Sequence, residues 1–212
     1  MIKGFGSVVI HEKTPRRSNA AVTPYMNYQN LLCLGDSQTF GARSYGCYPL
    51  YLARILRERS DYSWRAINRA TNGHTARDLW FRLGQELDGI GDTFQACLLI
   101  GTNDVGEATP IELFGEYYRQ CLEALFIKGY RSVFCGEIPP IHADGHGFFS
   151  RERAATRQAY NDACCTLVSS FPDAHWVEMG DIPRTCYEDP VHFNEAGNQW
   201  VAERFADAVM AR

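Results

Sequence analysis

Three short apolar runs stand out along the chain as candidate buried strands. They cover Asn30–Leu34, Ala96–Ile100 and Ser132–Cys135, and none of them alternates apolar with polar residues. Continuous runs of this length are typical of strands in a parallel sheet that is covered on both faces. Trp64–Asn68 and His175–Val177 are weaker strand candidates.

Segments with a helical period lie between these runs. In each segment apolar residues recur every three or four positions, which places them on one face of a helix. Thr75 and Asn194 stand just ahead of two such segments and are expected to be N-caps. The expected helices are Tyr48–Glu58, Thr75–Leu87, Ile111–Ile127, Arg153–Val168 and Ala196–Met210.

Strand and helix therefore alternate about five times, which predicts a doubly wound α/β fold. The length of 212 residues, with 45% hydrophobic and 22% charged residues, fits one domain with a sizeable core. Residues 1–29 show little periodicity. We expect them to form an N-terminal arm or an extra strand ahead of a domain at residues 30–212.

Charge and cysteine usage exclude several classes of protein. The formal net charge of −4 argues against a nucleic-acid partner, which needs a concentrated basic surface. No apolar run reaches the roughly 18 residues of a membrane span, so no membrane partner is expected. Cys33, Cys97 and Cys135 sit inside apolar runs, and no CxxC pair occurs among the eight cysteines. This pattern favours free, buried thiols and a cytoplasmic location.

Three polar motifs follow the predicted strands directly. Gly35-Asp36-Ser37 comes after the first strand, Gly73 after the second, and Gly101-Thr102-Asn103-Asp104 after the third. Ligands of an open α/β sheet bind beyond the carboxyl ends of its strands. Each motif alone is also what an ordinary polar turn requires. Together they offer a hydroxyl nucleophile, a glycine amide that a substrate can approach, and an amide side chain that can donate to an oxyanion.

A fourth motif near the end of the chain supplies an acid and a base. Asp189 and His192 are separated by Pro190 and Val191. A tight turn would bring the carboxylate to Nδ1 of the imidazole and leave Nε2 free to accept a proton from a serine. The four motifs together contain the groups that acyl transfer requires.

In these motifs and their order the sequence resembles the SGNH hydrolase family, also called GDSL esterases and lipases, over roughly residues 30 to 210. The resemblance implies a flavodoxin-like three-layer α/β/α sandwich whose parallel five-stranded sheet has the order 2-1-3-4-5. It implies that Ser37 attacks the acyl carbon, that His192 is general base and then acid, and that Asp189 orients His192. The amides of Ser37 and Gly73, with the Asn103 side chain, would form the oxyanion hole. It also implies a small-molecule ester substrate with a small or medium acyl group, with O-acetyl sugars among the candidates. No metal or other cofactor is implied.

Two other interpretations compete with a serine esterase. His142, Asp144 and His146 have the close spacing of metal ligands, which would suit a metal-dependent hydrolase. A Gly-rich loop that lines the substrate pocket explains the same residues. A non-catalytic module that binds a carbohydrate or an acyl group on the same fold is the second alternative, but it would have no need of an acid–base pair.

Overall fold

The expected strands pair into one parallel sheet with the order β2-β1-β3-β4-β5, which confirms the predicted topology. The computed structural model describes residues 27–91, 93–143 and 150–212. Most of the expected N-terminal arm therefore lies outside the described residues. The first strand starts two residues earlier than expected, and every other strand end lies within one residue of the expected position. The strands are β1 (Tyr28–Gly35), β2 (Ser63–Asn68), β3 (Gln95–Leu99), β4 (Ser132–Gly136) and β5 (Ala174–Val177).

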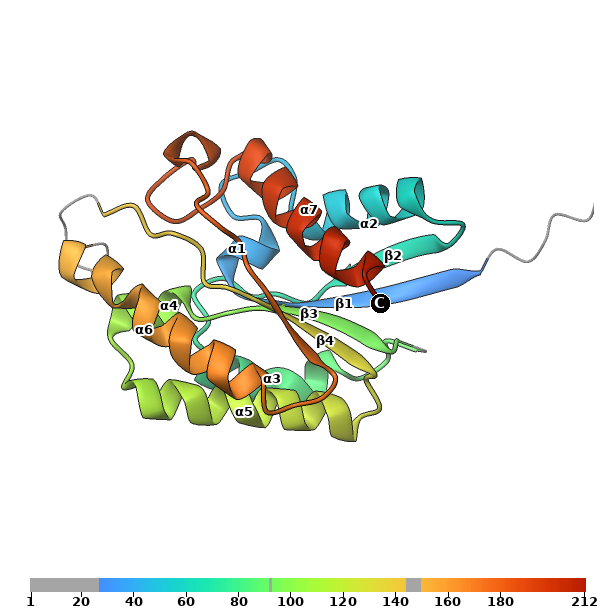
Figure 1. The fold of residues 1–212 in the computed structure, drawn as a ribbon, viewed down its shortest axis with the longest axis horizontal. Coiled ribbons are helices and arrows are strands. Elements are labelled where there is room, and N and C mark those ends of the chain that lie inside the picture. The colour runs from blue at the N-terminus through green and yellow to red at the C-terminus, as the bar shows by residue number, and fades with distance from the viewer. Residues whose placement is uncertain (1–26, 92, 144–149) are drawn as a thin grey trace, which may run out of the picture.

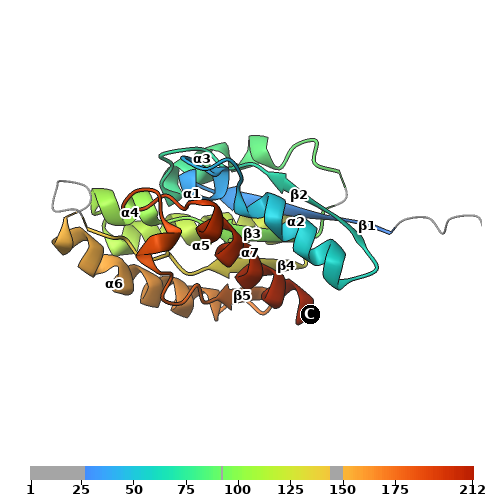
Figure 2. The same cartoon turned by 90° about the horizontal axis from the view of Figure 1, so that it is seen from above.

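Helices cover both faces of the sheet, so the molecule has three layers (Figures 1 and 2). All the helices that the apolar period predicts are present, with ends shifted by two residues or fewer. Two short helices, α1 and α4, were not predicted, because four to six residues are too few to show a period. The helices are α1 (Ser37–Phe40), α2 (Tyr48–Arg59), α3 (Ala76–Glu86), α4 (Thr102–Glu107), α5 (Ile111–Ile127), α6 (Arg151–Val168) and α7 (Glu195–Met210), with a 3-10 turn, η2, at Arg184–Cys186.

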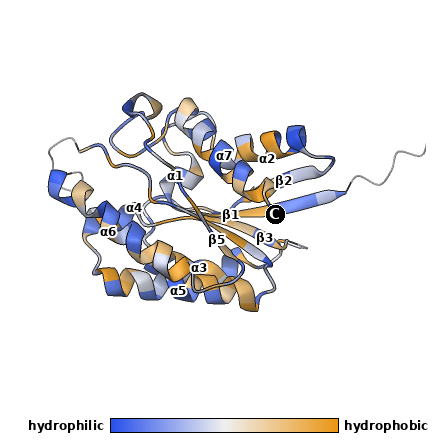
Figure 3. Cartoon of the chain, viewed as in Figure 1, coloured by the Kyte–Doolittle hydropathy of each residue, from blue (hydrophilic) through white to orange (hydrophobic). Residues whose placement is uncertain are grey.

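The continuous apolar runs are explained by burial of the sheet on both faces. Alternate side chains of a strand point in opposite directions. In β1, Leu32 and Leu34 pack into the core beneath α3, α5 and α6, whereas Leu31 and Cys33 pack into the core beneath α2 and α7. Figure 3 shows the apolar residues concentrated in the sheet and on the inner sides of the helices. A polar residue at any of these strand positions would be buried.

Helix starts are fixed locally by the expected caps. Thr75 and Asp78 form a reciprocal capping box at the start of α3. The Asn194 side chain accepts a hydrogen bond from the amide of Gly197 at the start of α7, at 3.2 Å. Both predicted N-caps are confirmed. None of the helices in the described part of the chain combines the length and apolarity of a membrane span.

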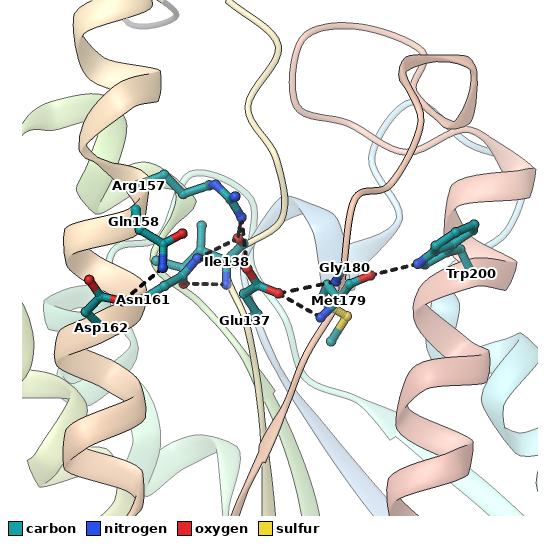
Figure 4. A network of polar contacts seen from close by, with 9 residues as sticks. All are labelled: Glu137, Ile138, Arg157, Gln158, Asn161, Asp162, Met179, Gly180 and Trp200. Carbon is teal, nitrogen blue, oxygen red and sulfur yellow. Dashed lines mark hydrogen bonds and ion pairs between the residues drawn. The ribbon is translucent and has the colours of Figure 1, made fainter.

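A polar network joins the ends of β4 and β5 to the helices on either side (Figure 4). Glu137, directly after β4, forms an ion pair with Arg157 of α6 at 3.2 Å. Its other oxygen accepts the amide of Met179, just after β5, at 2.9 Å. Trp200 of α7 donates its ring N–H to the Met179 carbonyl at 2.8 Å. The network thus ties the end of β4 to the first residues after β5.

Candidate active site

The motif residues gather in a cleft at the carboxyl ends of the parallel strands, as the fold predicts. The cleft has a volume of about 430 Å³, and four of the five expected site residues line it: Ser37, Gly73, Asn103 and His192. Asp189 lies behind His192. The other lining residues are Ala42, Arg43, Asn72, Thr102 and Val191.

Ser37 is presented at a sharp junction between β1 and α1. Gly35 sits so close to the neighbouring strand that a Cβ there would lie 2.2 Å from the carbonyl oxygen of Leu99. Asp36 is the N-cap of α1, and its side chain accepts the amide of Gln38 at 2.9 Å. Ser37 is therefore the first residue of the helix, with its hydroxyl at the edge of the sheet.

A chain of hydrogen bonds links Ser37, His192 and Asp189. The Ser37 hydroxyl oxygen lies 3.0 Å from Nε2 of His192. Nδ1 of His192 lies 2.7 Å from Oδ2 of Asp189. This order leaves Nε2 as the acceptor for the serine proton when Nδ1 carries the ring proton.

Asp189 is held by its own turn. Its Oδ1 accepts the backbone amides of Val191 at 3.0 Å and His192 at 2.8 Å. Partial burial alone would raise the pKa of Asp189, but these two amides and the His192 ring outweigh it and hold the pKa below its usual value. The carboxylate therefore remains charged and oriented toward the imidazole. Arg43 also approaches Oδ2, at 3.6 Å, but its side chain is 68% exposed, so we assign this pair little energy.

Gly73 and Asn103, two of the three expected oxyanion donors, line the same cleft as His192. Gly73 has a φ of +76°, and a Cβ at this position would meet nothing within 4 Å. The backbone there is therefore open to a ligand. The Asn103 side chain donates one N–H to the carbonyl of His74 at 2.9 Å. A side-chain amide has two N–H groups, so this bond orients the amide and leaves a second donor.

Arg82 holds the loop that carries Gly73, and no motif or periodicity in the sequence singles this residue out. Its Nε donates to Nδ1 of His74 at 2.8 Å, and its guanidinium also pairs with Glu86 and contacts the carbonyl of Gly35 at 3.4 Å. Partial burial and the positive charge of Arg82 lower the pKa of His74. His74 is thus kept neutral and accepts at Nδ1, while its carbonyl positions Asn103.

Asp36 and Asp104 are buried carboxyl groups behind the cleft. Asp104 Oδ2 accepts the amide of Ala76 at 2.9 Å, which ties the motif after β3 to the start of α3. Burial raises the pKa of Asp104 to about 6. Burial also raises the pKa of Asp36 to about 7; the amide of Gln38 opposes this shift and the nearby Asp104 adds to it. These aspartates support the site without lining it.

Replacement of Asp36 by asparagine should remove a pH-dependent loss of stability. The pKa of Asp36, about 7, lies above the ordinary value of 3.8, so the folded protein binds this proton more tightly than the unfolded chain. The carboxyl group therefore favours folding fully below about pH 4, and that contribution is lost as the pH rises through about 7. Asparagine cannot ionise, and its oxygen can still accept the amide of Gln38.

Urea unfolding between about pH 4 and pH 8 measures this effect. Relative to the wild type, Asp36→Asn should gain free energy of unfolding as the pH rises, by on the order of 1.4 kcal/mol for each unit of pKa shift. Asp181→Asn, at an exposed position, is the control and should show a constant difference from the wild type. A constant difference for Asp36→Asn as well would contradict the raised pKa.

The proposed metal ligands cannot be placed together. Asp144 and His146 lie outside the described residues, whereas His142 packs edge-on against the Tyr187 ring at 4.6 Å between centroids. Over the described ranges, no three His, Cys, Asp or Glu side chains are grouped closely enough to hold a metal ion. All eight cysteines are free thiols.

Comparisons with solved structures agree with this fold. An acetyl xylan esterase matches with a TM-score of 0.70 and 18% identity, over 85% of this chain and 99% of that one. An acetyl-xylooligosaccharide esterase from Geobacillus stearothermophilus, solved as a variant, matches with a TM-score of 0.70 and 17% identity, over 87% and 95%. An α/β hydrolase from the metagenome of Lake Arreo, Spain, matches with a TM-score of 0.67 and 21% identity, over 88% and 97%. Among curated protein sequences, none matches the chain.

A family model provides the assignment that these distant similarities cannot provide alone. The model of the GDSL-like lipase/acylhydrolase family matches residues 33–200, which include the end of β1, strands β2 to β5, the cleft and all four motifs. The chain therefore belongs to the GDSL-like lipase/acylhydrolase family and is a carboxylic ester hydrolase.

Proposed function

We propose that the protein is a serine ester hydrolase that works through an acyl-enzyme on substrates with a small or medium acyl group. The observation that carries the proposal is the line of hydrogen bonds from Ser37 through His192 to Asp189, at 3.0 and 2.7 Å. Ser37 and His192 line a cleft that Gly73 and Asn103 also line. The residues expected to supply the nucleophile, its base and the three oxyanion donors therefore line one cleft.

In the first half of this mechanism, Ser37 Oγ attacks the acyl carbon while His192 Nε2 takes its proton. The negative charge that develops on the acyl oxygen is stabilised by the amides of Ser37 and Gly73 and the side-chain N–H of Asn103. The imidazolium gives its proton to the leaving alcohol oxygen as the carbon–oxygen bond breaks. Asp189 stabilises the imidazolium and keeps its proton on Nδ1.

In the second half, a water molecule replaces the alcohol. His192 takes a proton from the water as it attacks the acyl-enzyme, and then returns that proton to Ser37 Oγ as the acid leaves. The same oxyanion donors serve both halves. No metal takes part in any of these steps.

O-acetyl sugars are the substrate class that we favour within this reaction. The cleft volume of about 430 Å³ suits a small acyl group with part of its leaving group. Two similar structures are esterases whose names specify acetylated xylan or xylo-oligosaccharides.

The free state of all eight cysteines supports the expected cytoplasmic location.

Hydrolysis of p-nitrophenyl acetate, butyrate and octanoate in the presence of a chelator tests the proposal. We expect turnover that resists chelation, favours acetate or butyrate over octanoate, and is blocked when an aryl phosphonate modifies Ser37. Mass spectrometry of the modified peptide identifies the labelled residue. Acetate release from an acetylated xylo-oligosaccharide tests the favoured leaving group.

Each alternative has its own outcome in this experiment. Loss of activity with the chelator would favour a metal-dependent hydrolase that uses His142, Asp144 and His146. Absence of turnover with every ester, together with no phosphonate adduct, would favour a binding module on the same fold. A clear preference for octanoate would contradict the small or medium acyl group.

A further inference from the structure

Gln38 follows the proposed nucleophile directly, yet its side chain does not line the cleft. It is 2% exposed and points back into the protein. Its Nε2 donates to the carbonyl of Val191 at 2.9 Å, and its Oε1 accepts the hydroxyl of Thr102 at 3.2 Å. We propose that Gln38 is a positioning residue. Through Val191 it holds the turn that carries His192, and through Thr102 it holds the start of α4, which carries Asn103, at fixed positions relative to Ser37. The inference rests on the proposed function of this site.

The two hydrogen bonds of Gln38 are made to residues that adjoin the expected catalytic groups, so a displacement there would move those groups. Gln38 is the chain neighbour of Ser37, Val191 is the neighbour of His192, and Thr102 is the neighbour of Asn103. One side chain therefore joins its own segment to two others, which lie 64 and 153 positions further along the sequence. Each contact is one residue away from a group that would touch the reacting atoms.

The chemistry of a side-chain amide suits both partners at once. An amide can donate to the Val191 carbonyl while it accepts from the Thr102 hydroxyl, which neither leucine nor a carboxylate can do. Val191 is 3% exposed and Thr102 is 4% exposed. Loss of Gln38 would leave buried polar groups without their partner, and such groups shift or admit water to recover a hydrogen bond.

A shift of the Val191 carbonyl moves His192 with it. The Ser37–His192 bond is 3.0 Å long, and proton transfer needs the base within hydrogen-bond reach of the hydroxyl. A displacement near 1 Å can cost on the order of 10²-fold in rate. We therefore expect Gln38→Leu to lower kcat by about 10- to 100-fold. KM for p-nitrophenyl acetate should change by less than about threefold, because the residues that line the cleft are unchanged.

Asn161→Leu is the matched control. Asn161 is another buried side-chain amide, also 2% exposed; it bonds both backbone groups of Ile138 and contacts Oε1 of Glu137 at 3.4 Å (Figure 4). Neither Asn161 nor Ile138 lines the cleft. Both variants should unfold at a lower temperature than the wild type, because each leaves buried groups unpaired. Only Gln38→Leu should slow turnover and the phosphonate labelling of Ser37.

Two further variants keep the test usable if Gln38→Leu does not fold. Thr102→Val retains the shape of the side chain and removes one of the two bonds, so it should lower kcat by about fivefold. Gln38→Glu retains the size but, when ionised, cannot donate to the Val191 carbonyl. It should be impaired at neutral pH in both kcat and labelling rate.

The outcomes separate this inference from the proposed function. If the wild type hydrolyses esters through Ser37 but Gln38→Leu retains the kcat and labelling rate of Asn161→Leu, the positioning role is overturned and the esterase remains. Equal fractional losses of kcat in the two variants would show a general effect of destabilisation and would also overturn it. If the wild type neither hydrolyses esters nor reacts with the phosphonate, the proposed function itself fails.

Discussion

Replacement of Ser37 by alanine should lower kcat for p-nitrophenyl acetate by on the order of 10⁴- to 10⁶-fold. The hydroxyl is the group in this site that His192 can activate, since its oxygen lies 3.0 Å from Nε2. Removal of Oγ prevents the acyl-enzyme from forming, whereas the oxyanion donors remain. A small rate above that of the uncatalysed reaction should therefore survive.

Ser44→Ala is the control for this variant. Ser44 lies seven positions further along the chain, and its hydroxyl accepts the amide of Gly46 at 3.5 Å. It should retain the turnover of the wild type and its labelling by the phosphonate, which Ser37→Ala should lose. Substantial ester hydrolysis by Ser37→Ala would show that the chemistry proceeds without an acyl-enzyme on this serine.

The second large effect is expected for Asp189→Asn, which should lower kcat by on the order of 10⁴-fold near neutral pH. The asparagine oxygen can still accept the amides of Val191 and His192, so the turn should be retained. Its NH₂ group would then face Nδ1 of His192 in place of Oδ2. That arrangement puts the ring proton on Nε2, which would donate to Ser37 and could no longer accept its proton.

Glu188→Gln removes a neighbouring, exposed carboxylate and should leave kcat unchanged. The position of the ring proton can be followed by nitrogen NMR of His192 in both variants. An Asp189→Asn protein that keeps its rate, with the proton still on Nδ1, would contradict the role proposed for the carboxylate. A rate loss in Glu188→Gln of similar size would point to a general effect of charge on the cleft.

The order of strands and helices along the chain was predictable, because a sheet that is buried on both faces requires continuous apolar runs in its central strands. β1, β3 and β4 are central, and their residues face one core or the other, so no polar position interrupts the apolar runs. Each long helix buries one side, so apolar residues recur every three or four positions along it. The strand order itself came from the resemblance to a family, because apolar patterns do not specify which strands are neighbours.

The residues of the candidate site were predictable because each belongs to a short local motif. Asp189 and His192 are three positions apart, so the turn between them sets their 2.7 Å contact. Ser37, Gly73 and Asn103 lie two, five and four residues beyond the ends of β1, β2 and β3, and the carboxyl ends of parallel strands meet at one edge of the sheet. These local motifs, combined with the rule for ligand sites in α/β sheets, were sufficient to predict that the residues lie close together.

The sequence by itself therefore determined the layers, the helix caps and the residues that face the cleft. Only the tertiary structure shows which residues support the cleft from behind. Gln38 hydrogen-bonds to Val191 and Thr102, and Arg82 hydrogen-bonds to His74 and Gly35. Burial also raises the pKa values of Asp36 and Asp104. The two Gln38 contacts and the Arg82–Gly35 contact join positions 47 to 153 residues apart in the chain. A polar residue in a turn has the same local pattern whether it is solvated or buried, so only the packed structure distinguishes the two.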